Sequence, residues 1–407
     1  MTSRWVIGLA SSSSADGVEA ALLELDGIGL GLRIKPICST RQPYPRDLAE
    51  LLRRAGGLTP CEVRQIALLH RLLGETFAAA ARQVADRASM SLQKIQCLGC
   101  PGHTVCHEPD GRFPASLTLG MAAVVAERTG VTTISDFRAR DLAVGGQGVP
   151  LTALVDYLLF RHAEENRILL HLGGLARVVH VPALSRPQDV IGFEAGPCNV
   201  LLNSLMRRLT GGREAYDPGG KHAVQGRCLE PLLQRWLAHP YLNRRPPKSL
   251  ARHEFGDDFA QQTVQLALQK GWALHDVLCT ATHFVARGVT DALQRFLPAN
   301  GFRTRVLLSG GGVRNGLLWH LLEQQLAGIA LEKLDAHGIP GDVRKPLGFG
   351  VLAALTVDGV AANVPSATGA AGARVLGNLT PGSSANWARC LAWMARRTAL
   401  PEEMLEP

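Results

Sequence analysis

The part of the sequence that decides the fold reads Trp5-Val6-Ile7-Gly8-Leu9-Ala10, then Ser11-Ser12-Ser13-Ser14-Ala15-Asp16-Gly17, then the alternating segment 18–25. A short apolar run, a turn of small residues and a second run with alternating polarity predict a β-hairpin. Hydroxyl groups and one carboxylate line the predicted turn. Hairpins and turns of the same kind occur twice more in the chain.

Two further glycine turns follow predicted strands. Residues 167–181 read as strand, Gly173-Gly174 turn and strand, which repeats the first hairpin about 160 residues later. Residues 305–308 lead into Ser309 and Gly310-Gly311-Gly312, and residues 317–326 then have helical spacing. Glycine lets the main chain approach a phosphate, and backbone N–H groups in such turns form anion sites. The order of the three turns therefore indicates a phosphate-binding protein.

The segments between these turns alternate between helical and strand patterns. Helices are predicted at 48–54, 62–87, 117–129 and 198–209, and strands at 95–98, 132–134 and 190–194. This alternation predicts an α/β protein with a parallel or mixed sheet layered by helices. A length of 407 residues suits two or three domains, and we expect the seam between lobes near residues 136–148.

Composition excludes several other classes of protein. The net charge of +8 is diffuse and aromatic residues make up 5%, so a base-stacking nucleic-acid platform is not expected. The longest uncharged stretch, 359–373, is rich in small residues rather than an apolar run of about 20, so no membrane span is predicted. The apolar run 5–10 is too short for a secretory signal, so no signal peptide is predicted. Nine cysteines, an odd number, favour a reducing compartment, and we expect the cytoplasm.

A cluster of sulfur and imidazole residues raises the alternative of a zinc site. Cys97 and Cys100 stand two residues apart, and His103, Cys106 and His107 follow closely. No second Cys-x-x-Cys pair exists elsewhere in the sequence, and Pro101-Gly102 indicates a strand ending in a turn. The sequence therefore favours a structural role for these residues over zinc.

Longer motifs give a resemblance that covers nearly the whole chain. The first is Asp136-Phe-Arg138-Ala-Arg-Asp141-Leu-Ala-Val-Gly145-Gly146-Gln147-Gly148-Val-Pro-Leu151, and the second is Gly192-Phe-Glu194-Ala-Gly196-Pro-Cys198-Asn199. With the Pro246-Pro247-Lys248-Ser249 turn, the Ser309–Asn315 turn and Thr368-Gly369-Ala370, in this order, the chain closely resembles the bacterial anhydro-N-acetylmuramic acid kinases.

The resemblance implies a fold and a division into domains. It implies an actin-like ATPase and sugar kinase fold: two duplicated ribonuclease-H-like α/β lobes with a nucleotide and sugar cleft between them. On this basis we expect an N-terminal lobe at 1–136 and a larger C-terminal lobe at 137–380. We expect the segment 381–407 to pack back on the first lobe. The family also implies a homodimer.

The resemblance further implies a cell-wall recycling kinase. Such an enzyme uses ATP and water to open a 1,6-anhydro sugar and phosphorylates O6, giving N-acetylmuramic acid 6-phosphate. Glu194 stands at the position of the family's base, an aspartate that activates the water; the alternative is that Glu194 only caps the following helix. Asp16 would meet Mg²⁺ through water. The implied nucleotide contacts are Ser11, Ser12, Ser13, Ser14, Asp16, Gly17, Gly173, Gly174, Gly310, Gly311 and Gly312.

The sugar would be bound mainly by the charged and glycine-rich motif. The implied contacts are Arg138, Asp141, Gly145, Gly146, Gln147, Gly148, Gly196 and Asn199. For Arg138 the alternative is an ion pair with Asp136 or Asp141.

Several polar positions differ from the family pattern. Ser12 and Cys198 replace glycines, Pro101 replaces a histidine, His171 and Arg177 replace asparagines, Glu194 replaces an aspartate and Lys345 replaces a glutamate. These changes leave open an alternative function, that of a catalytically lapsed or re-purposed paralogue that binds a sugar or nucleotide and acts as a regulatory protein.

Overall fold

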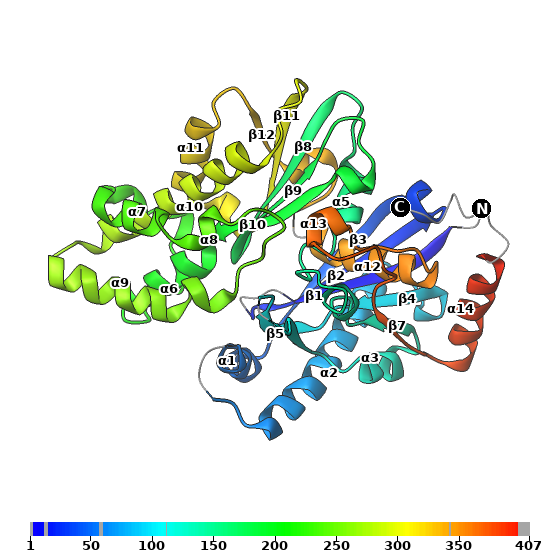
Figure 1. Ribbon diagram of the computed structural model, residues 1–407. Coiled ribbons are helices and arrows are strands. Elements are labelled where there is room, and N and C mark those ends of the chain that lie inside the picture. Colours follow the sequence, from blue (N-terminus) through cyan, green and yellow to red (C-terminus); the bar gives the residue numbers. More distant parts are fainter. Residues whose placement is uncertain (1–2, 12–14, 57–59, 111, 342, 398–407) are drawn as a thin grey trace. The chain divides into compact units, whose positions relative to one another are not determined.

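Two units, each built round its own sheet, make up the chain (Figure 1). The computed structural model describes residues 3–11, 15–56, 60–110, 112–341 and 343–397. Unit 1 comprises Met1–Phe160, Arg186–Gln188 and Asp342–Pro407, and unit 2 comprises Arg161–Ser185 and Asp189–Gly341.

The sheet of unit 1 has the strand order β13-β7-β4-β1-β2-β3. Its strands are β1 (Arg4–Ser11), β2 (Gly17–Asp26), β3 (Arg33–Pro43), β4 (Ile95–Cys100), β7 (Thr132–Ser135) and β13 (Asn378–Thr380). β1, β2 and β3 form an antiparallel meander, and β4 and β7 continue the sheet in parallel with β1. The predicted first hairpin is therefore the centre of this sheet.

The sheet of unit 2 repeats this topology with the order β10-β9-β8-β11-β12. Its strands are β8 (Glu165–Leu172), β9 (Leu175–Val181), β10 (Ile191–Pro197), β11 (Arg303–Ser309) and β12 (Ala330–Lys333). The first three again form an antiparallel meander, and β11 and β12 run parallel to β8. Three antiparallel strands followed by two parallel ones, present twice, confirm the predicted pair of duplicated ribonuclease-H-like folds.

Helices cover both faces of the sheet in unit 1. Ile7 and Leu9 of β1 point to α2 (Val63–Arg87) and share a buried core with its Phe77. Gly8 points to the opposite face, because side chains alternate along a strand. There α12 (Arg344–Val357) approaches so closely that a Cβ added to Gly8 would lie 1.7 Å from the Pro346 carbonyl oxygen.

The other elements of unit 1 complete these layers. They are α1 (Arg46–Ala55), β5 (His103–Glu108), β6 (Ala115–Leu119), α3 (Ala122–Thr129), α4 (Ala139–Leu142), α5 (Ala153–Phe160), α13 (Pro365–Thr368) and α14 (Ser384–Arg397). α14 is tied to the sheet by Asn386, whose side-chain nitrogen donates to the carbonyls of Ile95 and Gln96.

The core of unit 2 joins its sheet to a group of helices that includes α10, the longest of the unit's described helices. They are α6 (Asn199–Leu209), α7 (Glu230–Leu237), α8 (Pro240–Asn243), α9 (Asp257–Lys270), α10 (Leu274–Phe296) and α11 (Gly316–Gln325). Phe193 of β10 and Phe284 of α10 are buried in the same apolar cluster as Trp236 of α7. This packing fixes β10, and Glu194 stands in the middle of this strand, directly after Phe193.

Two expectations differ from the structure. The helix predicted at 117–129 is confirmed in its C-terminal part but starts later than predicted: residues 115–119 form strand β6, and the helix α3 begins only at Ala122. Gly120, with φ +138°, separates the two elements, a conformation that favours glycine. The division into units also departs from the predicted lobes, because residues 137–160 and 342–380 group with unit 1. The packing of α12 on β1 and β4 explains this grouping.

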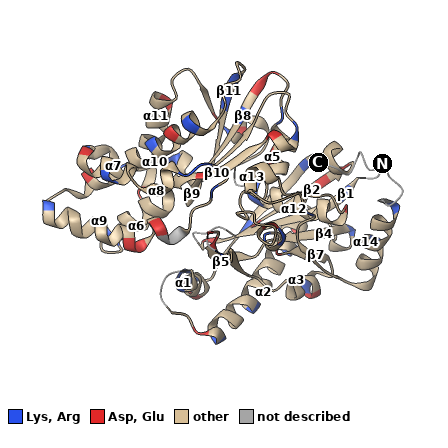
Figure 2. Cartoon of the chain, in the orientation of Figure 1, with Lys and Arg blue, Asp and Glu red and all other residues tan. Residues whose placement is uncertain are grey.

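Basic and acidic residues are mixed along the chain in both units (Figure 2). Figure 2 shows Lys and Arg spread over many elements of both units, with Asp and Glu among them. Among the residues the structure describes, no helix is both long and apolar enough to cross a membrane.

Candidate functional site

The Gly173-Gly174 turn between β8 and β9 rests on the start of α6. The carbonyl oxygen of Gly173 accepts a hydrogen bond from the Asn199 N–H at 3.0 Å, and that of Gly174 accepts from the Val200 N–H at 2.9 Å. The first N–H groups of a helix have no partner within the helix, so these bonds satisfy them and fix the turn. The predicted nucleotide contacts Gly173 and Gly174 and the predicted sugar contact Asn199 are thus joined by hydrogen bonds.

The second glycine turn of unit 2 lies against the first. A Cβ added to Gly310, where φ is +88°, would lie 2.6 Å from the Leu172 carbonyl oxygen, and one added to Gly312 would lie 2.7 Å from the Leu172 Cβ. The His171 Nδ1 and Ser309 Oγ atoms are 3.0 Å apart. The two glycine turns are far apart in sequence but meet in one place; their residues are Gly173, Gly174, Gly310, Gly311 and Gly312. The His171 imidazole lies beside them, where the family pattern has an asparagine amide.

Glu194 stands on β10, the strand that leads into α6, and is 2% exposed. Its Oε1 accepts a hydrogen bond from Arg177 Nη2 at 3.0 Å, and its Oε2 accepts from the Leu250 backbone N–H at 2.8 Å. Glu194 precedes α6 by several residues, and neither oxygen is bonded to an N–H of that helix in the described contacts. The structure thus gives the carboxylate a cationic and a backbone donor rather than the helix-capping role.

The segment 241–250 holds the backbone of Glu194 from two directions. The Tyr241 hydroxyl donates to the Glu194 carbonyl oxygen at 2.7 Å, and the Glu194 N–H donates to the Lys248 carbonyl oxygen at 3.0 Å. The Lys248 ammonium is buried and donates to the carbonyls of Tyr241 and Leu242 at 3.2 and 3.3 Å. It also lies 4.7 Å from the centre of the Tyr241 ring.

Burial sets the protonation behaviour of Lys248. Desolvation lowers the pKa of this ammonium to about 8, with the charges of Arg244 and Arg295 acting in the same direction. Sequence reasoning assigned no role to Tyr241, Lys248 or Leu250. The Pro246-Pro247-Lys248-Ser249 turn was the available signal, but it does not reveal that its lysine is buried.

Gly196 and Asn199 complete the group around Glu194. Gly196 is buried on β10, and a Cβ there would lie 3.4 Å from Leu242 Cδ2. Asn199 Nδ2 donates to the Leu172 carbonyl oxygen at 3.3 Å. The Asn199 side chain therefore links α6 to the strand that carries His171, in addition to the backbone bonds of its turn.

Unit 1 holds the other predicted phosphate turn. Ser11 Oγ lies 2.7 Å from both the Tyr44 hydroxyl and His103 Nδ1. Burial raises the pKa of the Tyr44 hydroxyl well above its usual range. Asp16 is about half exposed, and its Oδ2 lies 3.5 Å from Arg41 Nη2. A Cβ at Gly17, with φ +156°, would lie 2.3 Å from the Gln42 carbonyl oxygen. The predicted contacts Ser12, Ser13 and Ser14 lie outside the described residues.

The charged and glycine-rich motif is also in unit 1, and Asp141 is its centre. This carboxylate is fully buried; its Oδ2 accepts from the Gly148 N–H at 2.7 Å, and its Oδ1 accepts from Asn363 Nδ2 and Thr368 Oγ1, each at 2.7 Å. Arg138 donates to the Gly148 carbonyl oxygen. A Cβ at Gly146 would lie 2.2 Å from Asp141 Oδ2.

These contacts bear on the roles predicted for the motif. Asp141 organises the loop 145–148 through its own hydrogen bonds, and Arg138 contacts the loop backbone. In that loop Gly145 is exposed and Gln147 is half-buried. The Gln147 N–H donates to the Thr368 carbonyl oxygen at 2.7 Å. Contact of Arg138, Asp141, Gly145, Gly146, Gln147 and Gly148 with a sugar stays a prediction.

The cysteines near His103 do not form a metal centre in the described part of the chain. No group of three or more His, Cys, Asp or Glu side chains there could hold a metal ion. Cys97 and Cys100 are fully buried in β4, and burial raises the pKa of the Cys100 thiol to about 12, whereas metal ligation needs the thiolate.

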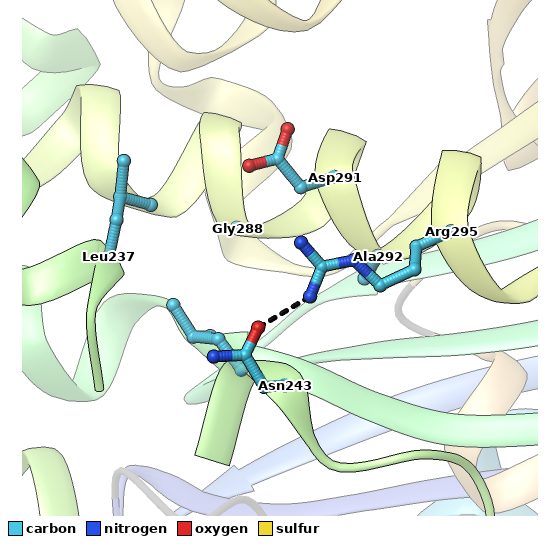
Figure 3. Close-up of a pocket in the computed structure, with 7 residues that line it drawn as sticks. Leu237, Asn243, Gly288, Asp291, Ala292 and Arg295 are labelled. Carbon is cyan, nitrogen blue, oxygen red and sulfur yellow. Dashed lines mark hydrogen bonds between the residues drawn. The ribbon is translucent and has the colours of Figure 1, made fainter. Parts of the chain in front are cut away.

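A small pocket of unit 2 is lined by α10, Leu237, Leu242 and Asn243 (Figure 3). Asn243 Oδ1 accepts a hydrogen bond from Arg295 Nη1 at 2.5 Å across it. Its volume of about 30 Å³ is far below the roughly 300 Å³ or more of ligand pockets, so it is too small for a sugar or a nucleotide.

The duplicated sheets, the glycine turns at the strand ends and the buried carboxylate define the class of actin-like ATPases and sugar kinases. The sequence profile of one family, anhydro-N-acetylmuramic acid kinase, matches residues 4–382. An anhydro-N-acetylmuramic acid kinase of Salinibacter ruber is 37% identical over 383 residues, 93% of this chain and 96% of that protein. One of Gloeobacter violaceus is 38% identical over 378 residues, with coverages of 92% and 98%. The chain therefore belongs to the anhydro-N-acetylmuramic acid kinase family.

The comparison with solved structures gives weaker likeness. The (R)-2-hydroxyglutaryl-CoA dehydratase component A of Acidaminococcus fermentans has a TM-score of 0.43 and 12% identity, and covers 86% of this chain and 98% of its own.

Proposed function

We propose that this protein is a kinase that opens 1,6-anhydro-N-acetylmuramic acid hydrolytically and phosphorylates its O6 with ATP, giving N-acetylmuramic acid 6-phosphate. Glu194 carries the proposal: it is a buried carboxylate whose two oxygens and backbone are all held in place, on the strand β10 that leads into α6. Membership of the family over residues 4–382 supports the same reaction.

Glu194 acts as the general base in this reaction. Each carboxylate oxygen has one protein donor and keeps a lone pair that can accept a proton from water. The water oxygen forms a bond to the anomeric carbon, the bond from that carbon to O6 breaks, and the electron pair goes to O6. O6 then bonds to the γ-phosphorus, and ADP leaves. One water and one ATP are consumed for each sugar phosphate formed.

The glycine turns of unit 2 are the proposed nucleotide contacts of that unit, and Ser11, Asp16 and Gly17 are those of unit 1. Gly173, Gly310 and Gly312 are packed against the chain itself, since a Cβ at each would collide with His171 or Leu172. The backbone N–H groups of Gly173, Gly174 and Gly310–Gly312 are the proposed contacts for phosphate or adenosine. The exposed Asp16 carboxylate suits contact with a hydrated Mg²⁺, because hard cations prefer oxygen ligands and keep several waters. When bound, Mg²⁺ neutralises phosphate charge. We further propose a cytoplasmic homodimer, as the family resemblance implies.

The alternative, a catalytically lapsed paralogue, is not favoured. The chain is 37–38% identical to kinases of the family over more than nine tenths of its length. The replacement of the family's aspartate by Glu194 retains a carboxylate, and its neighbours hold it firmly.

The test measures the sugar phosphate directly. Purified protein, ATP, Mg²⁺ and the anhydro sugar are expected to give N-acetylmuramic acid 6-phosphate by mass spectrometry, with one ADP per product. E194Q keeps the shape but cannot accept a proton, so we expect its kcat to fall by about 10²–10⁴-fold. The matched control is E164Q, at an exposed glutamate of the same unit. No product from the wild-type protein, or a full rate for E194Q, would refute the proposal.

A further inference from the structure

Arg177 of β9 lies directly opposite Glu194 of β10. The two residues are partners in the antiparallel register, which brings their side chains to the same face of the sheet. Arg177 Nη2 donates to Glu194 Oε1 at 3.0 Å. We propose that Arg177 is a positioning residue for the reaction: it fixes the orientation and the charge of the Glu194 carboxylate without contacting the substrate. This inference rests on the proposed function, in which Glu194 is the base.

Arg177 supplies the counter-charge of the Glu194 carboxylate. The Glu194 side chain is 3% exposed, and a buried carboxylate is stable only if it is paired and hydrogen-bonded. Arg177 supplies the cation, and a guanidinium keeps its charge at every pH at which the enzyme works. The Leu250 N–H contributes a second donor but no charge. The carboxylate therefore depends on Arg177 for its counter-charge.

Arg177 also fixes the orientation of the Glu194 carboxylate. A glutamate has one more rotatable bond than an aspartate, so its carboxylate has more positions to adopt. Arg177 holds Oε1 and Leu250 holds Oε2, and two donors on different oxygens fix the plane of the group. A general base acts only within hydrogen-bond reach of the proton it removes, and misplacement by about 1 Å can cost 10²-fold in rate.

The Arg177 side chain lies partly at the surface of unit 2. Arg177 is 31% exposed while Glu194 is nearly inaccessible, so the pair reaches from the core of unit 2 to its surface. The exposed part of Arg177 raises the alternative that it binds an anionic group of a substrate. A positioning role and a binding role differ in their kinetics, because loss of positioning lowers kcat while loss of uniform binding raises KM.

The experiment compares R177A, R177K, E194Q and the double variant R177A/E194Q by kcat and by KM for both substrates. We expect R177A to lower kcat by about 10–100-fold with both KM values within about twofold, and R177K to recover part of the loss. The double variant is expected to be no slower than E194Q, because a residue that acts through another has no effect once that residue is removed. The matched control is R287A, which breaks the exposed Arg287–Asp291 pair on α10 and leaves kcat unchanged.

Two outcomes would overturn the inference while leaving the proposed function intact. One is a rise in KM with unchanged kcat for R177A, which would make Arg177 a binding residue. The other is the same fold-loss from R177A in the E194Q background, which would make its effect independent of Glu194. Melting curves show whether each variant folds, and R177K serves the comparison if R177A does not. A wild-type protein without product refutes the proposed function and, with it, the inference.

Discussion

Asp141 shows how one buried side chain can join two segments of unit 1 that lie far apart in sequence. Its oxygens accept hydrogen bonds from the Gly148 N–H, from Asn363 and from Thr368, each at 2.7 Å. Residues 363 and 368 are more than 200 positions away in sequence. The carboxylate thus joins the glycine-rich loop to the segment that follows α12.

Replacing Asp141 is expected to lower the free energy of unfolding of the protein. D141A leaves three buried donors unsatisfied, and at about 1 kcal/mol or more for each we expect a loss of about 3 kcal/mol in the free energy of unfolding. D141N places an amide N–H group against donors and is expected to recover little. Thermal and urea unfolding measure the loss, with D86N at an exposed position of α2 as the control. Equal stability of D141A and D86N would contradict this role.

Sequence reasoning proposed residues for the candidate site but did not predict the contacts between them. The glycine turns were predicted from their position after strands, and Glu194 from its motif. The bond from Arg177 to Glu194 was not predicted, because the register of β9 and β10 is not visible in either motif. Arg177 and Glu194 were noted as two separate departures from the family pattern, and the structure shows them as one ion pair. Lys248 was missed as a buried residue because lysine is normally a surface residue.

Among the elements, α12 depends most directly on glycine. It packs on β1 and β4, where a Cβ at Gly8 would lie 1.7 Å from the Pro346 carbonyl oxygen and one at Gly99 would lie 2.0 Å from that of Phe349. These atoms belong to helix backbone, which cannot move aside as a flexible side chain can. The sequence predicted β1 but gave no partner for Gly8, because α12 comes more than 330 residues later.

We therefore expect G8A to force α12 away from the sheet. Overpacking of this kind costs about 3 kcal/mol, and the melting temperature should fall by several degrees. The matched control is G31A in the same unit, because a Cβ at Gly31 meets nothing within 4 Å. Both variants add the same methyl group, so the difference between their melting temperatures measures the contact with α12. A G8A protein as stable as G31A would show that the helix is not held at this distance.

At the scale of the whole molecule, the sequence revealed the duplication but not where the units divide. The repeated hairpin predicted two similar lobes, and the two sheets share one strand order. The boundary was misplaced because the chain returns: after unit 2 it comes back to unit 1 at residue 342 and adds α12, β13 and α14. Hydrophobic periodicity predicts elements in chain order and does not show that a C-terminal segment packs on the N-terminal unit.

The two units are expected to differ in their response to acid, because unit 2 contains a histidine buried without a charge partner. His180 of β9 is 1% exposed, stands between Ile168 and Ile191 of the neighbouring strands, and has no hydrogen-bond partner for Nδ1 in the described part of the chain. Desolvation lowers the pKa of His180 to about 4. An unfolded histidine has a pKa near 6.5.

The sign of the effect follows from proton binding. Between about pH 6.5 and pH 4 the unfolded chain binds a proton at His180 that the native state does not, so stability is full above pH 6.5 and falls as the pH drops. At about 1.4 kcal/mol for each pH unit, the loss at pH 5 is about 2 kcal/mol, or about 30-fold in the population of the opened state. H180L has no proton to bind and should escape this loss.

Amide hydrogen exchange of peptides from β8, β9 and β10 measures this difference within the intact protein. Wild type and H180L are compared at the same pH, so intrinsic exchange rates cancel, and we expect the ratio of their rates to rise by about 30-fold between pH 7.5 and pH 5. Peptides from β1 and β2 provide the reference in unit 1, and H320L, at an exposed histidine of unit 2, is the control variant. An unchanged ratio at the two pH values would mean that His180 does not make unit 2 acid-sensitive, since every other titrating group is common to both proteins.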